Sequence, residues 1–312
     1  MTKPTVSVAM ITYGHEKYIK QAIEGVLMQE CDFEIELIIT NDCSPDKTDK
    51  IVNEIIQNHP KSSWIKYTLH EQNIGMNPNF IWNLEQCEGK YIAICEGDDY
   101  WTDTLKLQKQ VDLMEKTESY SLCFHNVTIL KGHKKSIQYK TRKQPFFYTI
   151  KDLAKINFIH TCSVMYKREF MKDILNLTKL NLPATDYVTH MLAANYGDIG
   201  YINEPMAVYR EGVGVWSSNS ELKILSDWVI VLNYLIDYYK ENQIIRDLLI
   251  QQKVNCYFNL CKIKDYSPNE EDLVTNFFLF RLKKDYTIMY QIDIFLNKII
   301  PNYKLIKKKI KK

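Results

Sequence analysis

The stretch Tyr91-Ile-Ala-Ile-Cys-Glu-Gly-Asp-Asp-Tyr-Trp101 carries three carboxylates directly after an apolar run. The run predicts a buried strand that ends abruptly, and Gly97 gives the backbone room to turn. Carboxylates gathered in one turn repel one another, so a site that holds all three favours a cation. Hard oxygen ligands in small number suit Mg²⁺ or Mn²⁺ bridging to the phosphates of a substrate. The three carboxylates are those of Glu96, Asp98 and Asp99.

A structural alternative for the same residues is an acidic turn that caps a helix beginning near Asp103. The motif alone is compatible with both interpretations. The position at the end of a strand favours the cation site, because ligands of α/β sheets bind beyond the carboxyl ends of the strands.

Strand and helix patterns alternate through the first hundred residues. Strands are predicted over residues 6–12, 35–40, 64–69 and 91–95. Helices, with apolar residues three and four apart, are predicted over residues 16–29, 46–58 and 77–87. This alternation is typical of an α/β fold with a mostly parallel sheet, right-handed crossovers and flanking helices.

The pattern becomes mixed after residue 100. We expect helices over 105–114, 168–175 and 185–195, strands over 121–130, 162–166, 200–202 and 207–209, and a basic, turn-rich loop at 132–144. From about residue 217 the signal is almost entirely helical. We therefore predict two domains, residues 1–216 and a helical C-terminal region at 217–312.

Polar residues also follow the other predicted strands. Thr12 and Tyr13 offer a hydroxyl and a flat ring suited to stacking on a base. Asp42 offers a carboxylate that can accept hydrogen bonds from a base or a ribose, and Asn73 adds an amide beside Gly75. Each has a structural alternative, because an aromatic side chain in a loop often only packs and Asp42 can cap the next helix.

Composition and charge narrow the class of protein. The net charge of +2 excludes nucleic acid as the expected main partner. The eight cysteines form no C-x-x-C pair, so we expect free thiols in a reducing cytoplasm rather than disulfides or a zinc site. We expect neither a signal peptide nor a transmembrane span.

The C-terminus is rich in lysine. This tail is compatible with simple solvation or with peripheral contact to anionic lipid on the inner face of the membrane, where each lysine contributes about 1 kcal/mol. The lysines are Lys304, Lys307, Lys308, Lys309, Lys311 and Lys312.

Four motifs together resemble the family 2 glycosyltransferases over roughly residues 5–216. They are Val8-Ala-Met-Ile-Thr-Tyr-Gly-His-Glu16, Ile38-Ile-Thr-Asn-Asp-Cys-Ser-Pro-Asp46, Asn73-Ile-Gly75 and Glu96-Gly-Asp-Asp-Tyr-Trp101. The resemblance implies a GT-A fold, which has a Rossmann-like sheet, and a metal-dependent site for a nucleotide-sugar donor. The family often has Asp where this chain has Glu96.

The resemblance also implies roles for the matching residues. Asp42 would contact the base, typically uracil. Asp98 would contact the ribose or the metal, and Asp99 would hold Mn²⁺ or Mg²⁺ against the diphosphate. The remaining donor-binding residues would be Thr12, Tyr13 and Glu16, which line the nucleotide pocket, and Asn73 near the base.

The later part of the match implies a catalytic base. Inverting transfer needs a carboxylate on the acceptor side, and Asp186 at the start of a predicted helix stands where the family has one. Its alternative role is to complement the helix dipole. Arg210 would pair with the diphosphate, although Glu211-Gly212 stands where many relatives have a histidine. His160 is a further candidate at the border of the acceptor pocket.

The sequence therefore predicts a cytoplasmic, inverting hexosyltransferase that moves a sugar from a UDP-linked or other nucleotide-sugar donor to a glycan or lipid-linked acceptor, as in bacterial cell-surface polysaccharide synthesis. One alternative is a nucleotidyltransferase, which usually carries a glycine-rich basic loop where this chain has Thr12-Tyr-Gly-His-Glu16. Another is a non-catalytic subunit that binds nucleotide sugars, against which the intact carboxylates argue.

Overall fold

The computed structural model describes residues 3–138, 146–171, 175, 182–214, 216–260 and 262–263. The chain divides between Asn219 and Ser220 into two compact units. The first unit contains the sheet and every residue predicted to bind the donor, to hold the metal or to act as the base. The predicted domain boundary at residue 216 lies close to the division.

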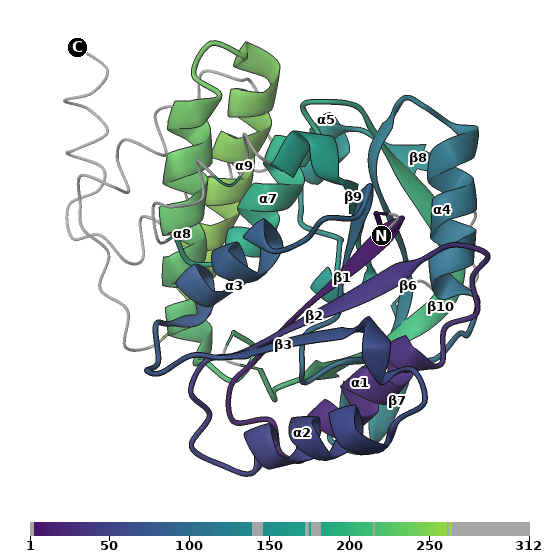
Figure 1. Cartoon of the computed structure of the whole chain (residues 1–312). Helices are drawn as coiled ribbons and strands as arrows, with labels where there is room; N and C mark the ends of the chain where they lie inside the picture. Colours follow the sequence, from purple (N-terminus) through teal and green to yellow (C-terminus); the bar gives the residue numbers. More distant parts are fainter. Residues whose placement is uncertain are drawn as a thin grey trace, which may run out of the picture. The chain divides into compact units, whose positions relative to one another are not determined.

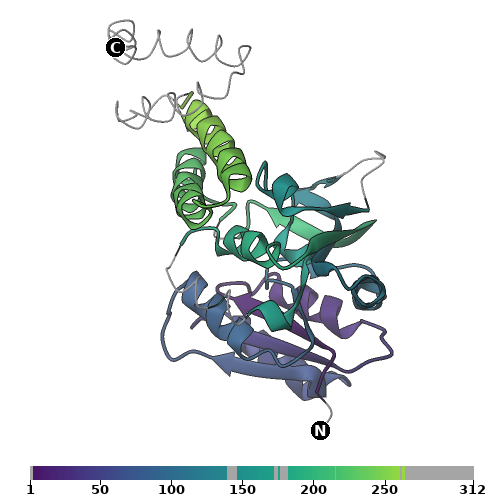
Figure 2. The ribbon, with the colours of Figure 1, turned by 90° about the horizontal axis from the view of Figure 1, so that it is seen from above.

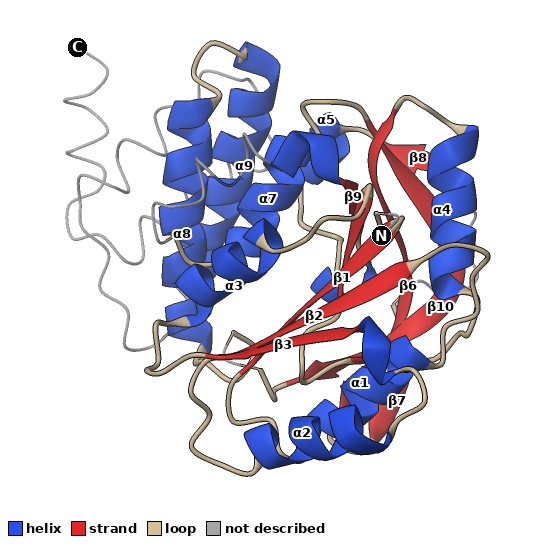
Figure 3. Ribbon diagram, viewed as in Figure 1, coloured by secondary structure: helices blue, strands red, loops and turns tan. Residues whose placement is uncertain are grey.

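The first unit is built on one ten-stranded mixed sheet (Figures 1 and 3). Its strands are β1 (Val6–Thr12), β2 (Ile35–Asn41), β3 (Ile65–Leu69), β4 (Tyr91–Ile94), β5 (Tyr100–Trp101), β6 (Tyr120–Lys131), β7 (Lys134–Ile137), β8 (Phe147–Tyr148), β9 (Met165–Lys167) and β10 (Asp198–Glu211). The order across the sheet is β3-β2-β1-β4-β9-β6-β10-β5, with β7 paired to β6 and β8 to β10. Strands β1 to β4 are parallel, as are β6 and β10, whereas β9 is antiparallel to both β4 and β6.

Helices flank this sheet. In the first unit they are α1 (Ile19–Leu27), α2 (Thr48–Asn58), α3 (Met76–Glu85), α4 (Lys106–Lys116), α5 (Ile150–Leu153) and α7 (Thr185–Ala193). Right-handed crossovers and the strand order require α3 to lie on the face opposite to α1 and α2, and Figure 1 shows this arrangement. In the view of Figure 2 the purple and blue N-terminal part of the unit lies beside the teal and green part that carries β6 and β10.

The second unit pairs two long helices, α8 (Glu221–Tyr238) and α9 (Gln243–Leu260). Ser220 caps α8 by accepting a hydrogen bond from the backbone N–H of Lys223. The indole of Trp228 donates to Gln252 Oε1 across the pair at 2.8 Å. None of the helices in the described residues is long and apolar enough to cross a membrane. The lysine-rich tail lies outside the described residues.

Continuous apolar runs explain the central strands. Strands β2 and β4 are buried along their whole length, as is β1 except for Ile11, and side chains on both faces are covered by helices or loops. On one face, Val8 and Met10 of β1 belong to the same core cluster as Ile23 of α1. Burial of each such side chain stabilises the fold by roughly 1.5–3 kcal/mol. The predicted α/β class, with a mostly parallel sheet, flanking helices and a helical C-terminal region, is confirmed.

Several predicted elements differ in the structure. The strand predicted over 162–166 is a single 3₁₀ turn, Thr161–Ser163, followed by β9. The two strands predicted near 200 and 207 are one strand, β10, whose register shifts on either side of Pro205 because proline cannot donate to the ladder. The helix predicted over 168–175 begins as a 3₁₀ turn, Arg168–Phe170, and most of the remainder lies outside the described residues.

The predicted loop at 132–144 also needs correction. The loop contains β7, which pairs antiparallel with β6, while residues 139–145 lie outside the described ones. The sequence missed β7 because all four of its residues are exposed and three of them, Lys134, Lys135 and Ser136, are polar. Seven cysteines of the described part are free thiols; Cys43 is exposed and Cys31 half-buried, whereas the other five are buried.

A buried asparagine of helix α3 forms hydrogen bonds to the C-terminal parts of strands β1 and β2. Nδ2 of Asn83 donates to Ile38 O at 2.9 Å, to Thr40 Oγ1 at 3.0 Å and to Met10 O at 3.2 Å. One side chain thus links β1 and β2 close to their C-terminal ends, where Thr12 and Asp42 lie.

We expect Asn83→Ala to lower the free energy of unfolding by about 1–3 kcal/mol, because it removes a donor shared by three buried acceptors. Urea unfolding followed by circular dichroism measures the change. The control is Asn58→Ala, since exposed Asn58 donates only to Glu54 O within its own helix. Equal losses in the two variants would contradict the role of Asn83.

Candidate functional site

The acidic turn follows β4 directly and gathers its three carboxylates. One oxygen from each of Glu96, Asp98 and Asp99 lies within 4.8 Å of the others. Asp98 and Asp99 are buried, and Glu96 is partly exposed. Helix α4 begins only at Lys106, and Asp103 itself accepts from the backbone N–H of Leu105. The turn therefore does not cap that helix.

Burial and mutual repulsion disfavour charge in this turn. They raise the pKa of Asp99 to about 8, with burial the larger cause and Asp98 the next. The pKa of Glu96 is raised well above its usual value by burial and then by Asp98, Asp99 and Asp186. Such a group binds protons or a cation, and three hard carboxylate oxygens fit Mn²⁺ or Mg²⁺.

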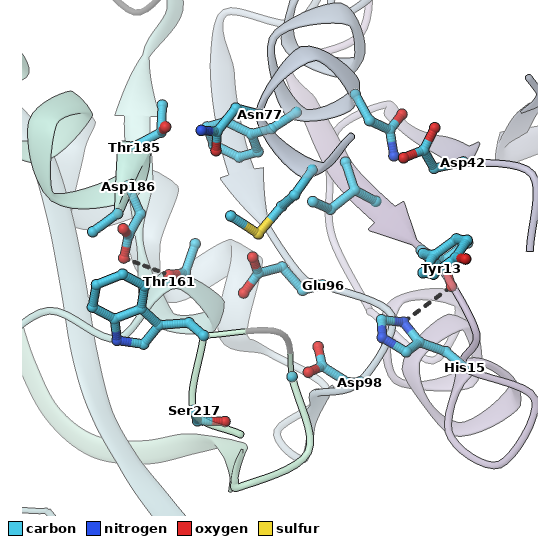
Figure 4. Close-up of a pocket in the computed structure, with 18 of the residues that line it drawn as sticks. Tyr13, His15, Asp42, Asn77, Glu96, Asp98, Thr161, Thr185, Asp186 and Ser217 are labelled. Atoms are coloured by element: carbon cyan, nitrogen blue, oxygen red, sulfur yellow. Dashed lines mark hydrogen bonds between the residues drawn. The ribbon is translucent and has the colours of Figure 1, made fainter. Parts of the chain in front are cut away.

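A cavity of about 340 Å³ lies over the ends of β1, β2 and β4. Figure 4 shows Glu96 between Asp186 on one side and Asp98 and His15 on the other, with Asp42 at the far end. The predicted residues that line the cavity are Thr12, Tyr13, Asp42, Asn73, Glu96, Asp98 and Asp186.

At one end of the cavity, Asp42 is held by the loop before α3. Its carboxylate accepts from the backbone N–H groups of Ile74 at 2.7 Å and Gly75 at 3.0 Å. Gly75 has a φ of 93°, which a side chain rarely tolerates, so glycine permits this approach. Each carboxylate oxygen has two acceptor positions, which leaves Asp42 capacity to bind a ligand.

On the opposite side, Asp186 lies in the first turn of α7. Thr161 Oγ1 donates to Asp186 Oδ2 at 3.2 Å. The residue before α7, Ala184, is left-handed with a φ of 46°, a strained conformation that tends to occur at functional sites. Asn77 Nδ2, from α3, donates to Leu182 O at 2.6 Å and so joins the segment just before α7 to the side of the cavity that α3 borders.

Other predicted residues lie outside the cavity lining. Glu16 accepts from the backbone N–H of Lys47 at 3.1 Å, and Asp99 accepts from the backbone N–H of Arg210 at 2.8 Å. The guanidinium of Arg210 donates to Asp98 O and to Gln21. The ring of His160 lies 4.5 Å from that of Tyr209, and burial lowers the pKa of His160 to about 4.

Sequence reasoning missed several residues at the cavity. His15 lines it and shares a 3.1 Å hydrogen bond with Thr12 Oγ1. Trp216 lines it too, and beside it a Cβ at Gly214 would lie 2.5 Å from Asp98 Oδ2. The first of the four motifs contains His15, but the sequence does not indicate that its side chain points into the cavity. Asn77 is the second residue of α3, and only the fold reveals its contact with Leu182 O.

The sequence comparisons point to one family. A family model described as Glycosyl transferase family 2 matches residues 7–175. An uncharacterized protein of Mycobacterium tuberculosis is 35% identical over 215 residues, which are 68% of this chain and 61% of that protein. TuaG of Bacillus subtilis, a glycosyltransferase with a provisional assignment to teichuronic acid biosynthesis, is 28% identical over 73% of this chain and 87% of TuaG. The chain thus spans about three fifths of the length of its mycobacterial relatives.

Solved structures agree on the fold. S. aureus TarS 1–349 in complex with UDP-GlcNAc has a TM-score of 0.61 and 18% identity, covering 82% of this chain and 73% of that one. The mannosyltransferase PcManGT from Pyrobaculum calidifontis, in complex with GDP-Man and Mn²⁺, has a TM-score of 0.55 and 15% identity, covering 95% and 86%. The predicted GT-A fold and family 2 resemblance are confirmed.

A buried histidine lies one helical turn after Asp186. His190 is fully buried, and its Nδ1 shares a hydrogen bond with the hydroxyl of Tyr166. Burial lowers the pKa of His190 to about 4, although Asp186 acts in the opposite direction. His190 is therefore neutral in the folded protein at neutral pH.

We expect His190 to make the fold weaker in acid. Between pH 6.5 and 4 the unfolded chain takes up a proton that folded His190 excludes, so the free energy of unfolding falls as the pH falls. From pH 7 to 4.5 this histidine accounts for about 2–3 kcal/mol of that loss. Urea unfolding of the wild type and of His190→Gln at both pH values measures it. An equal loss in the variant would contradict the assignment.

Proposed function

The chain belongs to glycosyl transferase family 2, and on that premise we propose that it transfers a sugar with inversion from a UDP-linked donor to an acceptor hydroxyl. The observation that carries the proposal is that one cavity combines the acidic turn, Asp42 and, on the opposite side, Asp186. Family membership favours this function over the nucleotidyltransferase alternative.

The donor half follows from the residues at the ends of β1, β2 and β4. Tyr13, 43% exposed at the cavity, offers a ring face to the base, and Asp42 accepts hydrogen bonds from it. Thr12 and Asn73 complete this end of the site. The ribose and diphosphate then extend toward Asp98.

The metal half belongs to the acidic turn. Asp98 and Asp99, with Glu96 beside them, would hold Mn²⁺ or Mg²⁺. When bound, the cation supplies positive charge to the departing nucleoside diphosphate. The solved complex of PcManGT contains Mn²⁺ with GDP-Man, which supports a metal-dependent donor site here.

The chemical step is a single displacement. Asp186, partly exposed at the cavity, accepts the proton of the acceptor hydroxyl. The oxygen forms a bond to the anomeric carbon as the bond from that carbon to the phosphate oxygen breaks, and the electron pair leaves with the diphosphate. Attack from the side opposite the leaving group inverts the anomeric configuration.

The acceptor class follows from the relatives. The provisional assignment of TuaG to teichuronic acid biosynthesis supports a glycan or lipid-linked acceptor of the bacterial cell surface. The C-terminal lysines fit peripheral contact with an anionic membrane, which also suits a lipid-linked acceptor. UDP-GlcNAc in the TarS complex makes UDP-hexoses the first donors to test.

We expect Asp186→Asn to reduce the rate of UDP release from the best UDP-hexose by roughly 10²–10⁴-fold, because the variant cannot take up the hydroxyl proton. UDP binding should stay within a factor of about three, since Asp186 lies away from Asp42 and Asp98. Turnover in the presence of simple sugar acceptors and calorimetry with UDP measure the two effects.

The control for Asp186→Asn is Asp112→Asn, on the exposed side of α4, which should retain full turnover. Turnover of Asp186→Asn close to that of the wild type would contradict the assignment of the base. An NMR coupling constant that shows a retained anomeric configuration would contradict inversion.

A further inference from the structure

Arg210 lies near the end of β10 and is only 7% exposed. Its backbone N–H donates to Asp99 Oδ1 at 2.8 Å. Its guanidinium Nη1 donates to the main-chain carbonyl of Asp98. Arg210 therefore holds two adjacent residues of the acidic turn: its side chain binds Asp98 and its backbone N–H binds Asp99.

The guanidinium is itself fixed on three sides. Its Cζ lies 4.4 Å from the ring centroid of Tyr100 and 5.0 Å from that of Tyr18. Its Nη2 donates to Gln21 Oε1 on α1. Stacking on aromatic rings and forked donation are what a planar guanidinium does and an ammonium does not. Arg210 thus joins α1, β5 and β10 behind the acidic turn.

The guanidinium of Arg210 points toward protein groups rather than into the cavity. The cavity is lined by the carboxylates of Glu96 and Asp98, whereas Arg210 is absent from its lining. Its charge lies on the protein side of the turn, where it offsets part of the repulsion between the carboxylates without occupying the space of a ligand. Nη1 and Nη2, the two guanidinium nitrogens that could fork onto a diphosphate, donate instead to Asp98 O and Gln21 Oε1.

We propose that Arg210 is a positioning residue for the metal site, which fixes the Asp98 carbonyl and the Asp99 side chain so that the carboxylates of the turn converge on one cation. This inference rests on the proposed function, because it takes the turn as the metal site. It differs from the role that the family resemblance implies, in which Arg210 pairs with the donor diphosphate.

Replacement of Arg210 by lysine distinguishes the two roles. A lysine side chain would keep the positive charge and the backbone N–H, but one ammonium cannot span Asp98 O and Gln21 while stacking on two rings. We expect Arg210→Lys to weaken binding of Mn²⁺ in the absence of nucleotide by about tenfold, as measured by electron paramagnetic resonance of free Mn²⁺. Uridine binding without metal, measured by calorimetry, should be unchanged.

Two further variants keep the test decisive if Arg210→Lys does not fold. Tyr18→Leu removes one stacking ring but keeps apolar bulk, and should weaken Mn²⁺ binding about threefold with unchanged uridine binding. The control, Arg168→Lys, changes an exposed arginine and should bind Mn²⁺ as the wild type does.

Three results would overturn the inference. Unchanged Mn²⁺ affinity in Arg210→Lys together with weaker binding of UDP, but not of uridine, would assign Arg210 to the diphosphate. Unchanged Mn²⁺ affinity in Tyr18→Leu would show that the stacking does not position the guanidinium. If the wild type binds UDP but Mn²⁺ neither binds nor improves that binding, the metal site fails and the positioning role fails with it.

Discussion

The crowding of three carboxylates in one largely buried turn is the constraint on which the first unit depends. Burial, and then repulsion between the carboxylates, raise the pKa of Asp99 to about 8, so the turn is unfavourable as a set of free anions. The surrounding chain still holds the turn closely. Arg210 binds it from behind, and a Cβ at Gly97 would come within 2.8 Å of His15 and Thr12. A fold that maintains such an arrangement is suited to a cation.

The rest of the first unit forms two sides of the cavity around this turn. The parallel strands bring Thr12, Asp42 and the acidic turn to one edge of the sheet, because the carboxyl ends of these strands point the same way. Antiparallel β9 and the turn before it bring Thr161 to Asp186 from the other side. Asn77 of α3 donates a hydrogen bond to Leu182 O just before α7, so the side of the cavity that carries Asp186 is joined to the side that carries Asp42. In the reaction that we propose, this geometry would separate proton removal from stabilisation of the leaving group.

The sequence predicts the parts of this structure whose signals are local. Continuous apolar runs reveal β1, β2 and β4, and the position of polar residues after them reveals Asp42 and the acidic turn. The sequence misses β7, which is exposed throughout and mostly polar, and divides β10 at Pro205. It also cannot reveal the contacts of Asn77 or Arg210, because their partners are main-chain carbonyls more than a hundred residues away, which have no signature in residue type.

Calorimetry of UDP binding to the wild-type chain, with Mn²⁺ and with the metal removed by a chelator, tests most directly the claim that the acidic turn and Asp42 form one metal-dependent donor site. We predict binding in Mn²⁺ at least tenfold tighter than in chelator, because the cation would join the diphosphate to the turn. Equal affinity under both conditions, or no binding of UDP under either, would contradict that claim.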